Sequence, residues 1–196
     1  MTTISYRPFE LDLIPTLDEL FATNQTAEAC WCMWFLIPVK EFHANGGQGN
    51  KAAFTAEARA GREPMGILAL DGDQTVGWCA VGPRSRFVRG VRTPTYAGRD
   101  AAEDDIVWLV PCFFTRPDRR RSGITAGLLG AAVDLAREHG ARAVEGFPFA
   151  AGGAHSGSDK QVNDETVFTS QGFTVVRRPS KNRVVVRREL GPASQS

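Results

Sequence analysis

The residues that could most clearly take part in binding or catalysis form a basic turn, Arg119-Arg120-Arg121-Ser122-Gly123. The turn follows an apolar run at 106–115 and precedes a segment from Ile124 in which apolar residues recur with the spacing of one helix face. The first backbone N–H groups of a helix lack partners within it, and glycine lacks a Cβ, so a phosphate can approach closely. Arginine adds a charge that persists at any working pH. The pattern predicts a strand, an anion-binding turn and a helix that ends at Gly140; the alternative is a solvated basic turn before a helix.

The run at 106–115 is rich in β-branched and aromatic side chains, which predicts a strand buried on both faces. Pro111 cannot donate a hydrogen bond to a neighbouring strand, so a β-bulge is expected near it. Further expected elements are a strand at 4–9, a helix with Pro15 in its first turn, a helix at 51–60 capped by Asn50, a hairpin at 66–81 around an Asp-Gly turn, a strand at 141–148, a short helix at 162–171, and closing strands at 173–176 and 183–187. Loops are expected at 43–50 and 150–158, and a solvated, arginine-rich loop at 82–105.

The length of 196 residues and the 42% hydrophobic content predict one domain at 1–190 and a disordered tail at 191–196. A net charge of +1 gives no overall attraction to nucleic acid or to a membrane surface. The longest apolar stretch, 30–39, is about half of a membrane span, and no signal peptide is evident, so a cytoplasmic protein is expected. The four cysteines lie in apolar surroundings, which predicts buried thiols and no metal site.

The segment Arg120-Arg121-Ser122-Gly123-Ile124-Thr125 resembles the Arg-x-x-Gly-x-Gly/Ala diphosphate loop of the GCN5-related N-acetyltransferases (GNAT superfamily), which bind acyl-coenzyme A. Thr125 stands where that family has a smaller residue. Gly172-Phe173 matches the end of the family's Tyr-x-x-x-Gly-Phe motif, but Phe168 replaces the tyrosine, so the role of that tyrosine as an acid is not transferred. The phrases at 30–33, 77–84 and 144–148 look like a branch whose members mostly lack an assigned acceptor, and the resemblance spans 4–188.

The resemblance implies an α/β (α+β) fold with three layers, in which a mixed, mostly antiparallel sheet splays between strands 4 and 5 and is flanked by helices. It implies acetyl-CoA as the cofactor, held by Phe113, Phe114, Thr115, Arg119, Arg120, Arg121, Ser122, Gly123, Ile124, Thr125, Ala126 and Phe168. The acceptor is expected at Trp31, Trp34, Glu103, Asp105 and Trp108. The dense aromatic segment at 29–35 has core packing as its alternative interpretation.

Acyl transfer to an amine requires the neutral amine, and an alkylamine gives up its proton at a cost of roughly 4.6 kcal/mol at pH 7. Some members of the family use a glutamate on the strand that corresponds to 106–115, and none is present here. Glu145, near the end of the adjoining strand, is the best substitute; the alternative is a surface carboxylate paired with an arginine. Cys112 could protonate the leaving thiolate or simply pack.

These expectations describe an N-acetyltransferase that moves an acetyl group from acetyl-CoA to a primary amine of a small molecule by direct attack. The resemblance allows a homodimer. No nucleic-acid or membrane partner is expected, because the net charge is only +1 and aromatic residues are sparse among the arginines at 84–99. A non-catalytic acyl-CoA sensor is the first alternative, because the tyrosine and the strand glutamate are missing. An arginine-rich RNA-binding module is the second, and it would lose affinity steeply with salt.

Overall fold

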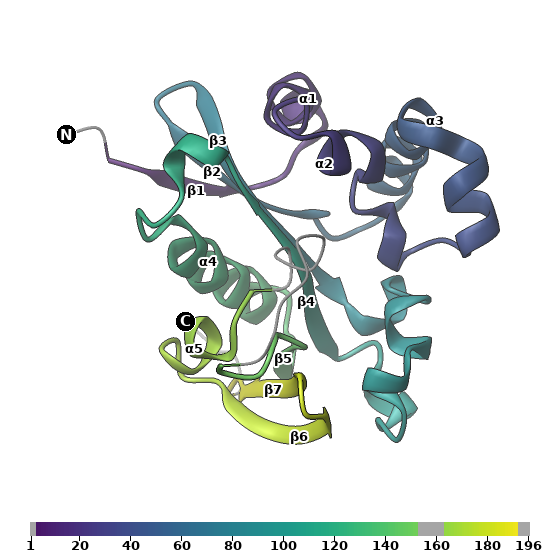
Figure 1. Cartoon of the computed structure of the whole chain (residues 1–196), viewed down its shortest axis with the longest axis vertical. Coiled ribbons are helices and arrows are strands. Elements are labelled where there is room, and N and C mark those ends of the chain that lie inside the picture. Colours follow the sequence, from purple (N-terminus) through teal and green to yellow (C-terminus); the bar gives the residue numbers. More distant parts are fainter. Residues whose placement is uncertain (1–2, 153–162, 192–196) are drawn as a thin grey trace.

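The computed structural model describes residues 3–152 and 163–191. Seven strands form one sheet in the order β1-β2-β3-β4-β5-β7-β6, in which the β4–β5 pair is parallel and the other pairs are antiparallel (Figure 1). The strands are β1 (Ser5–Pro8), β2 (Gly66–Asp71), β3 (Gln74–Pro83), β4 (Val107–Thr115), β5 (Ala143–Gly146), β6 (Thr174–Ser180) and β7 (Arg183–Glu189). The helices are α1 (Ile14–Phe21), α2 (Gln25–Cys30), α3 (Val39–Ala60), α4 (Ile124–Glu138) and α5 (Glu165–Thr169).

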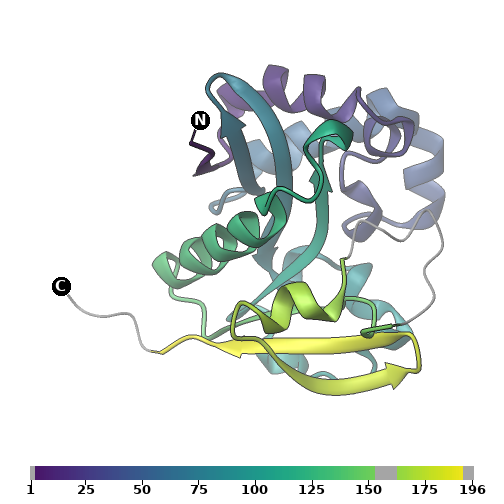
Figure 2. The ribbon, with the colours of Figure 1, turned by 60° about the vertical axis from the view of Figure 1, so that its left-hand side comes forward.

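Helices cover both faces of the sheet and complete the three expected layers. α4 and α5 lie on one face, while α1, α2 and α3 lie on the other (Figures 1 and 2). The α4 face is packed mainly by aliphatic side chains, including Leu128 and Leu129 of α4. The opposite face is aromatic, with edge-on ring contacts that join Phe21 to Trp31 and Trp78. The expected fold class is therefore confirmed.

The sheet splits beside Pro111. Ala80 pairs with Cys112 and Gly82 pairs with Leu109, so two β4 residues, Val110 and Pro111, lie opposite one residue of β3. This is the expected β-bulge. Pairing between β4 and β5 ends at Val110↔Gly146, although β4 continues to Thr115. Within the described residues β4 is therefore paired from Cys112 onward on the β3 side alone, and the expected splay between strands 4 and 5 is confirmed.

Several local predictions hold. The β2–β3 hairpin turns at Gly72, which has a φ of +62°, a conformation that glycine adopts without strain. α1 carries Pro15 in its first turn and buries Leu17, Leu20 and Phe21. α4 ends at Glu138 and is followed by Gly140 at φ +73°. All four cysteines are buried thiols.

The predicted loop at 43–50 is wrong. α3 runs through it and departs from helical geometry only at Gly46 (φ +58°, ψ −170°). Asn50 is no helix cap: its buried side chain donates hydrogen bonds to the carbonyl oxygens of Ala29 (2.8 Å) and Phe42 (3.3 Å). A Cβ on Gly47 would lie 3.2 Å from the backbone oxygen of Glu28. The glycine and asparagine residues therefore permit close packing of α3 on α2.

The predicted solvated loop at 82–105 is also wrong. It forms four short 3₁₀ turns and buries Phe87, Val91 and Tyr96. Arg84 is only 1% exposed and pairs with Asp104 and with a β5 carboxylate. The segment contributes to the core because Arg84, Arg86 and Arg99 are each paired with a carboxylate. The loop predicted at 150–158 lies mostly outside the described residues, as does all but the first residue of the tail at 191–196. None of the described helices has the length and apolar character needed to cross a membrane.

Candidate functional site

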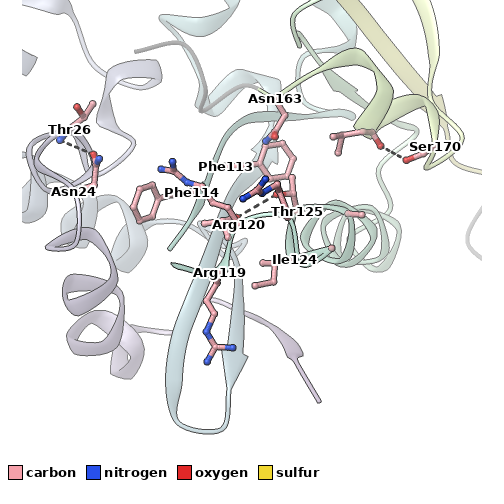
Figure 3. Close-up of a pocket in the computed structure, with 15 residues that line it drawn as sticks. Asn24, Thr26, Phe113, Phe114, Arg119, Arg120, Ile124, Thr125, Asn163 and Ser170 are labelled. Atoms are coloured by element: carbon pink, nitrogen blue, oxygen red, sulfur yellow. Dashed lines mark hydrogen bonds between the residues drawn. The ribbon is translucent and has the colours of Figure 1, made fainter. Parts of the chain in front are cut away.

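A cavity of about 610 Å³ occupies the split beside β4 (Figure 3). Its walls come from both faces of the sheet: α2 on one side, α4 and α5 on the other, with the end of β4 and the turn after it between them. The lining residues are Asn24, Thr26, Phe113, Phe114, Thr115, Arg119, Arg120, Arg121, Gly123, Ile124, Thr125, Ala126, Asn163, Val167 and Ser170. The cavity therefore passes along the β4 edge that β5 leaves unpaired.

The turn between β4 and α4 exposes backbone donors to this cavity. Arg121 (φ +63°) and Gly123 (φ +80°) both adopt left-handed conformations, and a Cβ on Gly123 would meet no atom within 4 Å. The first helical hydrogen bond of α4 runs from the Gly127 N–H to the Gly123 carbonyl (3.1 Å). The N–H groups of residues 124–126 precede that bond, so α4 supplies no acceptor for them. Because all three residues line the cavity, the start of α4 has the geometry of an anion site.

The three arginines of the turn are not equivalent. Arg119 forms an ion pair with Asp71 at 2.5 Å, and Figure 3 shows its side chain extending along the β2–β3 hairpin. Arg120 and Arg121 are exposed and make no ion pair with any residue in the described part of the chain. Arg120 and Arg121 are therefore the cations available to an anion in the cavity.

Most residues predicted to bind the cofactor lie together in the lining, and their role in binding stays a prediction. Ser122 and Phe168 are the two that the lining does not include. The Ser122 hydroxyl donates to the Arg119 carbonyl at 2.5 Å. Phe168 is fully buried, with edge-on contacts to Phe113 (5.9 Å) and Phe173 (5.2 Å). The ring that replaces the family's tyrosine is therefore a core residue.

Five lining residues were not anticipated from the sequence: Asn24, Thr26, Asn163, Val167 and Ser170. The Asn24 side-chain oxygen caps α2 by accepting from the N–H groups of Thr26 and Ala27. Its position before the helix was a local signal of a cap, though not of a cavity. Asn163 adopts φ +59°, which asparagine tolerates better than most residues. These residues reach the cavity through tertiary folding, from segments more than 130 positions apart.

Glu145 lies outside the cavity lining and is held by two arginines. It is 5% exposed, and its Oε2 and Oε1 accept hydrogen bonds from Arg84 Nη1 and Arg187 Nη1, each at 3.0 Å. The geometry favours the interpretation of Glu145 as an arginine-paired carboxylate, but buried instead of at the surface. Both oxygens are engaged by arginines and neither faces the cavity lining, and the role of Glu145 as a base stays a prediction.

The residues expected at the acceptor are dispersed, and none lines the cavity. Trp31 is in the aromatic core, and Trp108 packs against His139 near the start of β4, far along the strand from the turn. Trp34 is 38% exposed, with the Arg89 guanidinium 3.3 Å from its ring centre. Glu103 pairs with Arg187 and Arg142, while Asp105 is exposed. Hydrogen bonding from Arg187 lowers the pKa of Glu103.

Cys112 is buried on β4 beside Cys32. Its hydrogen bond with Cys32, together with burial, holds the pKa of the Cys112 thiol well above its ordinary value. A thiol with a raised pKa is a weak acid, which favours packing over proton donation to a thiolate. Among residues 3–152 and 163–191, no three His, Cys, Asp or Glu side chains are grouped in a way that could hold a metal ion.

No protein-family model and no curated protein matches the chain by sequence. Solved structures match it by fold. A GNAT superfamily phosphinothricin acetyltransferase from Sinorhizobium meliloti, in complex with acetyl-CoA, has a TM-score of 0.58 at 15% identity, and the match covers 100% of this chain and 92% of that protein's chain. An N-acetyltransferase from Staphylococcus aureus Mu50 has a TM-score of 0.58 at 10% identity, covering 96% and 99%. The Salmonella typhimurium protein yncA, solved with its cofactor acetyl-CoA, has a TM-score of 0.56 at 14% identity, covering 96% and 94%. The chain thus has the fold of the GNAT acetyltransferases.

Proposed function

We propose that the chain binds acetyl-CoA in the cavity beside β4 and transfers its acetyl group to a primary amine of a small molecule. One observation carries the proposal: a single cavity joins the free N–H groups at the start of α4 to the β4 edge that β5 leaves unpaired. An anion site next to an unpaired strand edge suits a ligand with a diphosphate at one end and an amide-containing arm. Two proteins of the same fold have been solved with acetyl-CoA.

In this proposal each part of the cavity has one task. The N–H groups of residues 124–126, with Arg120 and Arg121, hold the diphosphate. The backbone of β4 beyond Pro111 pairs with the amide groups of the arm, because β5 has left that edge. A backbone N–H between Cys112 and Phe114 polarises the thioester carbonyl, in the manner of an oxyanion hole. Phe113 and Phe114 contribute apolar walls that exclude water.

The need to remove a proton from the acceptor amine limits the class of substrate. Among the described residues, the lining contains no carboxylate and no imidazole that could act as a base. The amine must then arrive neutral, which at pH 7 costs roughly 1 kcal/mol for an α-amine of pKa near 8 and roughly 4.6 kcal/mol for an alkylamine. We therefore propose acceptors whose amine has a pKa near or below 8.

The experiment is a panel of small amines that spans pKa values from about 5 to about 10, assayed with acetyl-CoA by release of the free thiol. The expected result is turnover that favours the amines of low pKa and rises with pH as the neutral amine accumulates. Turnover confined to strongly basic alkylamines at pH 7 would show that a base is present and would contradict this account.

A non-catalytic acyl-CoA sensor is the second candidate, favoured by one observation. The described part of the lining offers neither a base nor the family's tyrosine, since Phe168 is buried in the core. Calorimetry separates the candidates when it is run beside the amine panel. Binding of acetyl-CoA without turnover of any amine supports the sensor, whereas binding with turnover supports the enzyme.

A further inference from the structure

A second, much smaller cavity adjoins the large one on the side away from the turn at 119–123. Its volume is about 10 Å³, and it is lined by Phe21, Ala27, Cys30, Cys32, Cys112 and Phe114. Phe114 lines both cavities. Along β4 the lining passes from Phe114 to Cys112, and along α2 it passes from Asn24 and Thr26 to Ala27 and Cys30. The small cavity therefore adjoins the large one at Phe114 and lies farther along both walls from the turn at 119–123.

The β-bulge beside Pro111 turns the side chains of Cys112 and Phe114 toward α2. Leu109 faces the α1–α3 side of the sheet and Val110 faces the α4 side. Strict alternation would then turn Cys112 toward α4, since side chains two residues apart share a face. The extra residue in the bulge reverses the alternation, and Cys112 and Phe114 face α2. The small cavity therefore lies where β4 separates from β5.

We propose that the small cavity is the inner end of the large one, receives the alkyl end of the acyl group and limits the donor to acetyl thioesters; the inference rests on the proposed binding of acetyl-CoA in the larger cavity. A volume of about 10 Å³ holds about one water-sized group, which a methyl matches. An additional methylene would have to displace Cys30, Cys112 or a ring of the aromatic core. Acyl length is thus set by the contact of α2 with β4.

The chemistry of the lining also selects an uncharged acyl group. Two phenyl rings, a methyl and three thiols surround the cavity. Burial raises the pKa of Cys30 to about 12, and hydrogen bonding with Cys32 together with burial raises that of Cys112, so both remain neutral thiols. A neutral buried thiol behaves as a small apolar side chain. A carboxylate, as in succinyl-CoA, would enter without a partner and would be rejected.

The test compares dissociation constants for CoA, acetyl-CoA, propionyl-CoA and succinyl-CoA by calorimetry, so that no acceptor is needed. Wild type is expected to bind acetyl-CoA about tenfold or more tightly than propionyl-CoA, the discrimination that one methylene supports. Cys30→Ala and Cys112→Ala enlarge the cavity and should move this ratio toward one. Cys79→Ala is the matched control, because Cys79 is also buried but packs on the α4 face of the sheet. Its ratio should equal that of wild type.

Ala27→Val tests the opposite change by filling the cavity from α2. It should weaken acetyl-CoA binding relative to CoA, which has no acyl group. The inference is overturned if wild type binds acetyl-CoA and propionyl-CoA equally, or if the three cysteine variants shift the ratio alike. Failure of every CoA compound to bind would instead overturn the proposed function, and the inference with it. Urea unfolding of each variant confirms that it is folded.

Discussion

Replacing Glu145 with glutamine is expected to destabilise the fold by about 3 kcal/mol. Glu145 joins Arg84 to Arg187 through two hydrogen bonds of 3.0 Å, and Arg84 is 1% exposed. Removing one partner of a buried pair costs about 3–5 kcal/mol because the other charge remains desolvated. The lower end applies, since Arg84 keeps its ion pair with Asp104 at 3.0 Å. Glutamine preserves the shape but presents an N–H₂ group to one of the two arginines.

Urea unfolding measures this change, provided that the m-value is the same in both proteins. Asp134→Asn is the control, because Asp134 pairs with Arg137 on the exposed surface of α4 and its loss should cost under about 0.5 kcal/mol. Turnover, measured at a temperature where both proteins are folded, should keep its dependence on pH. If Glu145→Gln unfolded within about 1 kcal/mol of wild type yet lost turnover along with the acidic limb of the pH–rate profile, where protonation inactivates a base, Glu145 would be the base and our interpretation of the ion pairs would be wrong.

Arg120→Ala should weaken acetyl-CoA binding about tenfold at low salt and less at high salt. Arg119→Ala should weaken it less, because Arg119 is paired with Asp71 of the hairpin. A larger loss of affinity in Arg119→Ala than in Arg120→Ala, measured by calorimetry, would contradict this assignment. Hydrogen bonding from Arg187 lowers the pKa of Glu103 in the folded state. The ionised carboxylate therefore stabilises the fold fully above the unfolded-state pKa of about 4.3. This contribution is lost as the pH falls through the folded-state pKa. Glu103→Gln should therefore reduce stability at pH 7 more than at pH 3, which urea unfolding at the two pH values measures. Gly46→Ala should lower the free energy of unfolding by about 1–3 kcal/mol, because Gly46 adopts a backbone conformation that is essentially restricted to glycine. An unchanged free energy of unfolding would mean that alanine fits at this break in α3 without strain.

The sequence specified those parts of the fold in which local chemistry leaves one solution. Pro111 in an apolar run required a bulge, and the structure has one. The Asp71-Gly72 turn and the periodic apolar residues after Gly123 likewise fixed the hairpin and α4. The turn at 119–123 could be placed for the same reason, since the strand, the glycine and the helix are contiguous in the chain.

Predictions failed where distant residues decide the structure. The glycines at 46–49 suggested a loop, but Gly47 allows α3 to approach the backbone of Glu28. The arginines at 84–99 suggested a solvated segment, but Glu145, more than 40 residues away, neutralises Arg84. Asn24 and Asn163 line one cavity from opposite ends of the chain. No local pattern contains such pairings, because they exist only after the sheet has formed.

Binding of acetyl-CoA to wild type, Gly123→Glu and Gly140→Glu, measured by calorimetry, tests the central claim most directly. Gly123 and Gly140 lie just before and just after α4, both with left-handed φ values and open space around the Cβ position, so glutamate strains the backbone similarly at each. Only Gly123 lines the cavity, where a carboxylate would repel a diphosphate. We predict that wild type and Gly140→Glu bind acetyl-CoA with similar affinity and that Gly123→Glu binds at least about tenfold more weakly. Equal binding by both variants, or none by wild type, would contradict the claim that the start of α4 holds the diphosphate.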